Sequence, residues 1–240
     1  MEHIVKKNLF IFSTSITICI TIFAIIDCKN DLFYSQCGQD KYINDNLFHN
    51  KKNGTFVEVG AHDGVSGSNT YFFEKNFGWT GICIEPNPDV FQQLAQNRRP
   101  ICIQCCVADF NGSAQFLKVK GYSQMLSGLY NLYDPRHLQR IENELHHFGG
   151  TKELIDIPVY TLNEIFTQHQ ISHVDLLSID TEGSEEKILQ GLDLKKFDVD
   201  IIVVENNFNS TAILQHLTAC GYNFLAKIGW DDIYRKRVNL

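Results

Sequence analysis

The feature that most constrains this chain is an alternation, from residue 31 onward, between short apolar runs and segments with helical periodicity. The runs at 55–59, 81–84, 174–179 and 201–204 are rich in Ile and Val and are too short for ordinary helices, so they predict buried strands. Strands that alternate with helices form a mostly parallel sheet covered on both faces. The sequence therefore predicts a doubly wound, Rossmann-like α/β fold.

Caps and turns predict several boundaries. Pro88 fits the first turn of a helix that runs to about Asn97. Thr161 and Glu164 form a capping box that opens another helix. The runs 222–228 and 232–238 predict a closing hairpin, which adds one antiparallel strand near the edge of the sheet.

Residues 121–150 interrupt the alternation. Before them we expect one strand over 101–107 and another over 114–119, joined by a turn at Asn111-Gly112. The segment itself is polar and aromatic, with helical spacing from Pro135 to His147 and a stop at Gly149-Gly150. It predicts an insertion over the sheet.

The first 30 residues do not belong to this pattern. No charged residue occurs between Asn8 and Ile26, and that length is near the minimum for a membrane-spanning helix. Lys6-Lys7 precede the run, so the positive-inside rule predicts a cytoplasmic stub and a single-pass anchor at 1–30, with the domain 31–240 beyond the membrane. A cleaved signal peptide and a buried helix of a soluble protein remain alternatives.

Charge and cysteine content narrow the class of protein. The net charge of -7 argues against a nonspecific nucleic-acid binder, which needs a basic face to displace counterions. The eight cysteines lie largely in apolar runs. Cys102 and Cys105 have metal-ligand spacing, but a second pair at zinc-finger spacing is missing, so core packing is the favoured interpretation.

Polar residues follow four of the predicted strands. Gly60 directly after the first strand allows a tight turn and close approach of a ligand to the backbone. Glu85 ends the second strand and has two oxygens for the two hydroxyls of a ribose. Because the carboxyl ends of parallel strands meet at one edge of a sheet, we expect both beside one ligand.

The third and fourth strand ends are acidic. Asp180 and Glu182 follow a buried strand, where carboxylates are costly unless they meet a cation, a proton or hydrogen-bond donors. Glu205 follows the next strand, together with Asn206 and Asn207. A positively charged sulfonium would explain the acids, and a divalent metal held by Asp180, Glu182 and Glu205 is an alternative, since oxygen ligands suit Mg²⁺.

From about Tyr34 to Arg237 the chain resembles the FkbM-type methyltransferase family. The resemblance lies in an ordered set of segments: SQCGQD (35–40), FVEVGAHDG (56–64), SNT (68–70), GWTGICIEPN (78–87), MLSG (125–128), LSIDTEG (177–183) and VENN (204–207). It implies a class I methyltransferase fold, S-adenosylmethionine as the cofactor, and O-methylation of a hydroxyl on a sugar, glycan or natural product. The segment 121–150 and the N-terminal segment are not shared by all members.

The resemblance also implies residue roles. We expect Asp180 to be the base that takes the proton of the acceptor hydroxyl, with His62 as second candidate. The residues expected to bind the cofactor are Gln39, Glu58, Gly60, Asp63, Asn69, Glu85, Pro86, Asp109 and Glu182.

Two other functions compete with an enzyme of this kind. One is a membrane-tethered, non-enzymatic relative that acts by binding a partner, because fold does not fix function. The other is an oxidoreductase that binds NAD or a nucleotide sugar. The glycine fingerprint G-x-G-x-x-G is missing, which disfavours a dinucleotide.

Overall fold

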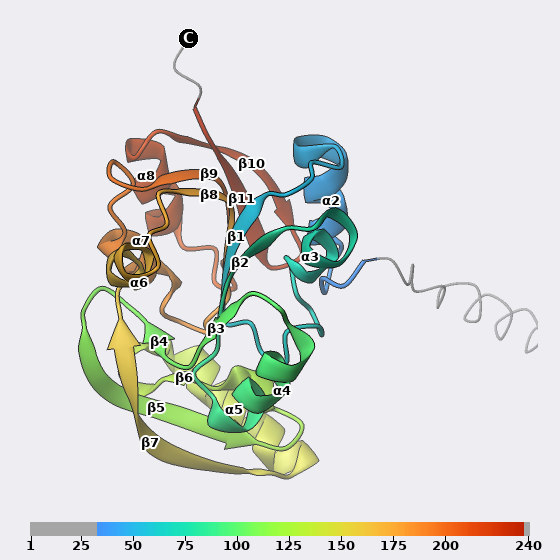
Figure 1. Ribbon diagram of the computed structural model, residues 1–240. Helices are drawn as coiled ribbons and strands as arrows, with labels where there is room; N and C mark the ends of the chain where they lie inside the picture. Colours follow the sequence, from blue (N-terminus) through green and yellow to red (C-terminus); the bar gives the residue numbers. More distant parts are fainter. Residues whose placement is uncertain (1–32, 238–240) are drawn as a thin grey trace, which may run out of the picture. The chain divides into compact units, whose positions relative to one another are not determined.

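The computed structural model describes residues 33–237, and the chain from Tyr34 onward clusters into one compact unit (Figure 1). A seven-stranded sheet runs through it in the order β10-β11-β9-β8-β1-β2-β3. The strand bounds, in that order, are Tyr222–Ile228, Asp231–Lys236, Asp198–Glu205, His173–Ile179, Thr55–Val59, Thr80–Ile84 and Ile101–Ile103.

Direct neighbours from β9 to β3 pair in parallel. β11 is antiparallel to both of its neighbours, β9 and β10. The sheet is thus mostly parallel with one reversed strand next to its edge, and the predicted class I methyltransferase fold is confirmed. The parallel strands place all their carboxyl ends at one edge, where ligands of such sheets bind.

Helices cover both faces of this sheet (Figure 1). One face carries α6 (Leu162–Gln168), α7 (Glu185–Gly191) and α8 (Thr211–Ala219). Their apolar residues pack with strand residues in one large buried cluster, which holds the sheet rigid. The other face carries α2 (Gln39–Ile43), the π-helical turn η1 (Asn44–Phe48), α3 (Tyr71–Phe77) and α4 (Pro88–Asn97).

A second sheet of four strands has the order β4-β7-β5-β6. Its long strands β5 (Gly112–Lys120) and β7 (Thr151–Tyr160) pair antiparallel over their whole length. The shorter strands are β4 (Cys106–Val107) and β6 (Gly128–Leu129). Between β5 and β7 the chain also forms the 3₁₀ turns η2 (Gln124–Leu126) and η3 (Tyr130–Leu132) and helix α5 (Pro135–Phe148). Ile141 of α5 packs on Leu117 and Val119 of β5.

Most predicted elements are confirmed, but one was wrong and one strand was missed. α4 begins at Pro88 and ends at Asn97 as predicted, and the Thr161 side chain accepts a hydrogen bond from the Glu164 N–H. The run 101–107, predicted as one strand, divides into β3 and β4, which belong to different sheets. β7 was not predicted at all.

The predicted membrane localisation is wrong for the part of the chain that the structure describes. Within residues 33–237 no helix combines the length and apolar character needed to cross a membrane. Helix α5 has 14 residues, which at 1.5 Å per residue is about 21 Å and short of a hydrocarbon core of about 30 Å. The segment 8–26, where the anchor was predicted, lies outside the described residues.

Candidate functional site

A cavity of about 430 Å³ lies at the carboxyl ends of the parallel strands. Its lining comes from the ends of β1, β2, β8 and β9 and, on the other side, from the segment between β5 and β7. The predicted residues that line it are Gly60, His62, Glu85, Pro86, Asp180, Glu182 and Glu205. The strand-end residues predicted from four separate segments are therefore brought to one cavity.

Gly60 determines how closely the ends of the neighbouring strands β1 and β8 approach each other. Its φ is 82°, in the left-handed region, and an added Cβ would lie 1.6 Å from the carbonyl oxygen of Asp180. No side chain fits there. The glycine therefore lets the turn after β1 pass against the end of β8, which carries the acidic residues.

Glu85 has the geometry of a ribose acceptor. It is 7% exposed, and its two oxygens accept hydrogen bonds from the backbone N–H groups of His62 (2.9 Å) and Asn87 (2.7 Å). Each carboxylate oxygen has a second lone pair for a ligand hydroxyl. Burial raises the pKa of Glu85 to about 7, although these two hydrogen bonds oppose the shift. A diol that donates to both oxygens would favour the ionised form.

Asn87 provides a second sign of a polar ligand. The residue is 1% exposed and lines the cavity, and its Oδ1 accepts a hydrogen bond from the backbone N–H of Asp89. Its Nδ2 is buried without a hydrogen-bond partner in the described structure. An unsatisfied buried donor costs about 1–3 kcal/mol, so a ligand acceptor atom at this position would recover that energy. The cavity therefore offers a polar ligand an amide donor as well as the carboxylate of Glu85.

Three carboxylates meet in the same cavity as Glu85. Asp180 and Glu182 follow β8, Glu205 ends β9, and one oxygen from each lies within 4.8 Å of the others. Burial raises the pKa of Asp180 to about 8, helped by the negative charges of Asp231 and Glu185. Burial and the charge of Asp180 also raise the pKa values of Glu182 and Glu205 well above the ordinary range. The carboxylate cluster therefore holds protons near neutral pH unless a cation is present.

His62, the second candidate base, sits in the turn after β1 with φ 48°. Both of its ring nitrogens are buried without a hydrogen-bond partner among the described residues. Burial lowers its pKa, and the nearby carboxylate of Asp63 offsets this only in part. A neutral imidazole that faces the cavity can accept a proton, so the geometry is compatible with the predicted role.

The structure adds residues that the sequence did not indicate. His137 and Arg140 of α5 line the cavity on the side opposite the sheet. Asp231 at the start of β11 pairs in register with Glu205 and is 6% exposed. Only the helical period of 135–147 hinted that one face of α5 would be buried, and nothing in the sequence indicated what that face would meet.

Five residues predicted to bind the cofactor lie outside the cavity lining. Glu58 is buried in an ion pair with Arg98, and Asp63 accepts hydrogen bonds from the backbone of its own turn. Gln39 and Asn69 both donate to Asp231 and are buried behind the site. Asp109 is exposed near Lys187, because β4 leaves the main sheet before this residue.

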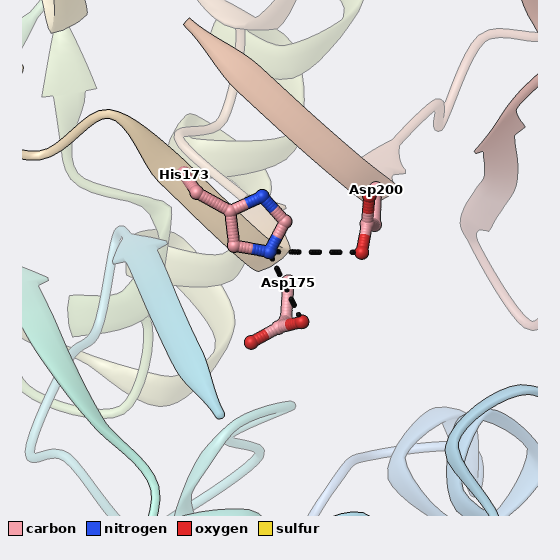
Figure 2. Close-up of side chains that lie close together, drawn as sticks. All are labelled: His173, Asp175 and Asp200. Atoms are coloured by element: carbon pink, nitrogen blue, oxygen red, sulfur yellow. Dashed lines mark hydrogen bonds and ion pairs between the residues drawn. The ribbon is translucent and has the colours of Figure 1, made fainter. Parts of the chain in front are cut away.

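A second group of titratable residues lies at the opposite edge of the sheet. Figure 2 shows His173 and Asp175 of β8 and Asp200 of β9 pointing toward one another. His173 Nε2 is 3.3 Å from Asp175 and 3.7 Å from Asp200. Asp175 also accepts hydrogen bonds from the Thr55 N–H and pairs with Lys51. Its oxygens are thus satisfied by the protein itself, and we interpret the group as a structural ion-pair network.

Comparison with known proteins agrees with this geometry. The family model for the methyltransferase FkbM domain matches residues 58–224, more than half of the chain. No curated protein matches the chain. Among solved structures, the methyltransferase FkbM from Methylobacillus flagellatus is 14% identical, with a TM-score of 0.51. The match covers 84% of this chain and 48% of that one.

A TehB-like SAM-dependent methyltransferase from Corynebacterium glutamicum is 8% identical with a TM-score of 0.43, and the match covers 93% of this chain and 97% of that one. At such identities the likeness to solved structures concerns the fold alone. The family match comes from the sequence itself and includes Glu58, Gly60, Glu85, Asp180 and Glu205. The chain therefore belongs to the FkbM family of methyltransferases, whose cofactor is S-adenosylmethionine.

Proposed function

We propose that this domain transfers a methyl group from S-adenosylmethionine to a hydroxyl of a sugar, glycan or other small natural product. The observation that carries the proposal is the carboxylate cluster of Asp180, Glu182 and Glu205, which shares one cavity with Glu85. The cofactor supplies a methyl group that its sulfonium makes electrophilic. The protein then has to orient two reactants and remove one proton.

We propose that Glu85 binds the ribose of the cofactor and that Asn87 binds the polar atoms of the cofactor near its adenine base. Gly60 provides the close backbone approach at the end of β1. The carboxylate cluster would face the sulfonium. Burial and mutual repulsion raise the pKa values of its acids, and a nearby positive charge would lower them and favour the ionised forms. This arrangement leaves the α5 side of the cavity for the acceptor.

We propose Asp180 as the base. A sugar hydroxyl is a poor nucleophile at neutral pH, and a positioned base contributes about 10²–10⁴-fold to the rate. A base works best when its pKa lies near the working pH, and the pKa of Asp180 is about 8. His62, on the same edge of the sheet, is the second candidate.

The test is turnover of the full chain with S-adenosylmethionine and a panel of mono-, di- and oligosaccharides, comparing wild type with Asp180→Asn. Asparagine keeps the size and one acceptor oxygen but cannot take a proton. We expect kcat to fall by about 10²-fold or more while cofactor affinity changes little. Asp200→Asn, at the opposite edge of the sheet, is the matched control and should keep full activity.

Other outcomes would revise the proposal in defined ways. Equal losses of rate and cofactor affinity in Asp180→Asn would assign Asp180 to the sulfonium rather than to the acceptor. Full turnover in that variant would move the base to His62. Transfer to amines but to none of the hydroxyl acceptors would contradict O-methylation.

A further inference from the structure

Two aromatic side chains lie exposed at the rim of the cavity. Phe208 follows the end of β9, and Trp230 lies in the turn between β10 and β11. Both line the cavity, yet Phe208 is 40% exposed and Trp230 is 57% exposed. Exposed apolar side chains scattered singly are ordinary, but two of them at the rim of one polar cavity indicate a contact with a ligand. We call these two residues the aromatic rim.

The turns that carry the aromatic rim are joined to each other and to the carboxylate cluster. The N–H of Asn206 donates to the carbonyl oxygen of Trp230 at 2.9 Å. Lys227 Nζ donates to the carbonyl oxygens of both residues, at 3.0 and 3.4 Å. Asp231, which directly follows Trp230, pairs in register with Glu205 of the carboxylate cluster. The rim is therefore held on a rigid frame beside the carboxylates, as a preorganised binding surface requires.

The two rings of the rim differ in what contacts them. The guanidinium of Arg136, from α5, lies over the Phe208 ring, with 3.9 Å between its central carbon and the ring centroid. This cation–π contact holds Phe208 against α5. The Trp230 indole makes no ring, cation–π or hydrogen-bond contact with any residue of the range 33–237. Trp230 is therefore the free ring, and the rim borders the α5 side of the cavity, which the proposed function leaves for the acceptor.

Two side-chain amides belong to the same rim of the cavity. Gln36 and Asn207 both line it. Asn207 directly precedes Phe208, and Gln36 precedes Cys37, whose Sγ would lie 2.5 Å from a Cβ added at Gly229. Neither amide makes a hydrogen bond within the part of the chain that the structure describes. An amide offers two donor hydrogens and one acceptor oxygen, which suit hydroxyl groups.

We propose that Trp230 is an acceptor-binding residue that stacks on one face of a pyranose ring, while Gln36 and Asn207 bind the hydroxyls of that ring. The face of an aromatic ring carries partial negative charge, and a pyranose face presents C–H groups of partial positive charge, so the two surfaces attract each other. An alkyl chain would leave the two amides without partners. The inference rests on the proposed function, because the stacked ring has to present a hydroxyl to the carboxylate cluster.

The chain contains its own reporter for this contact, because it has two tryptophans. Trp79 is 2% exposed and its indole N–H donates to the Lys51 carbonyl oxygen, whereas Trp230 lines the cavity. In ¹⁵N spectra of the full chain with S-adenosylhomocysteine, methyl glycosides of glucose, galactose and mannose at millimolar concentration should shift the Trp230 indole signal and not that of Trp79. Trp230→Phe identifies the signal. Sorbitol has hydroxyls but no ring and should shift neither.

The kinetic test compares Trp230→Ala with Trp230→Phe. Alanine removes the ring, so KM for a glycoside acceptor should rise about tenfold or more, while kcat at saturating acceptor and the affinity for S-adenosylmethionine change little. Phenylalanine keeps an aromatic face and should restore KM to within about threefold of wild type. Phe110→Ala is the matched control, because Phe110 is 41% exposed but lies outside the cavity lining, and it should behave as wild type.

The outcomes separate this inference from the proposed function. A Trp230 signal that no glycoside shifts, or that only phenols shift, would overturn the inference whether or not turnover is found. Methylation of glycosides with wild-type KM in Trp230→Ala would overturn it and leave the proposed function intact. Equal losses of cofactor and acceptor affinity in that variant would indicate a structural role and also overturn it. Glycosides that shift the signal but accept no methyl group would support the stacking contact and contradict the proposed function.

Discussion

A side chain at position 60 would collide with the neighbouring strand, so the site depends on one glycine. An added Cβ would lie 1.6 Å from the Asp180 carbonyl oxygen, and relief of that contact requires β1 and β8 to separate. Such separation would displace Asp180 from the cavity. At the residue scale, therefore, the contact between Gly60 and Asp180 positions both the candidate base and the turn that is expected to approach the cofactor.

Gly60→Ala should lower both stability and cofactor affinity. Gly38→Ala is the matched control, because Gly38 has a similar φ of 84° but an added Cβ there meets nothing within 4 Å. The control should lose about 1–2 kcal/mol from the left-handed backbone alone. Gly60→Ala should lose clearly more stability, measured by thermal unfolding, and should bind S-adenosylmethionine at least tenfold more weakly. Equal losses in the two variants would show that the close approach to Asp180 is unimportant.

Single residues also show how far the sequence predicts the site. Glu85 and Asp180 were predicted because each directly follows an apolar run, and strand ends of parallel sheets converge by topology. His137 and Asp231 reach the site through α5 and the β10–β11 hairpin, whose positions depend on tertiary packing. Asp109 illustrates the reverse case, since its exposed position follows from β4 joining the second sheet.

At the scale of elements, the main sheet was predictable and the second sheet was not. Runs such as Ile201–Val204 are buried on both faces and therefore carry a continuous apolar signal. β7 has no such signal, because Lys152 and Glu153 are exposed and Pro158 argues against a central strand. Its pairing with β5 joins residues that are 31 to 47 positions apart at its two ends, such as Lys120 with Thr151 and Gly112 with Val159.

The segment between β5 and β7 gives α5 its functional position. Its helix is amphipathic, and the apolar side packs on β5 through Ile141. The same packing brings His137 and Arg140 to the cavity. In the proposed placement of the two reactants, variation within this segment would change the acceptor side of the cavity without disturbing Gly60 or Glu85 on the cofactor side.

For the whole molecule, the protons held by the cavity make the free energy of unfolding depend on pH. Asp180 has a folded pKa of about 8 against 3.8 for an ordinary Asp, so between these values the folded state binds the additional proton. Stability from this group is therefore lost as the pH rises toward 8. Glu85, with a pKa of about 7, acts in the same direction up to that pH.

Denaturant unfolding of the free protein at pH 6.5 and pH 8 measures this effect. Asp180→Asn removes the titration, so relative to wild type it should gain about 1–2 kcal/mol between the two pH values. The comparison cancels other groups that titrate in this range. Among them are His173, whose pKa is raised because hydrogen bonds to Asp198 and Asp175 outweigh burial, and Cys102. A constant difference between the two proteins would mean that Asp180 is ionised in the free cavity.

The most direct test of the account is calorimetric titration of the full chain with S-adenosylmethionine, comparing wild type with Glu85→Ala. Glu142→Ala, an exposed glutamate of α5, serves as control. The account predicts one site per chain in wild type and control, and about 10- to 100-fold weaker binding in Glu85→Ala, because a hydrogen bond to a charged group contributes about 1.5–3 kcal/mol. Wild-type affinity in a folded Glu85→Ala protein would contradict the placement of the cofactor at the carboxyl ends of the strands.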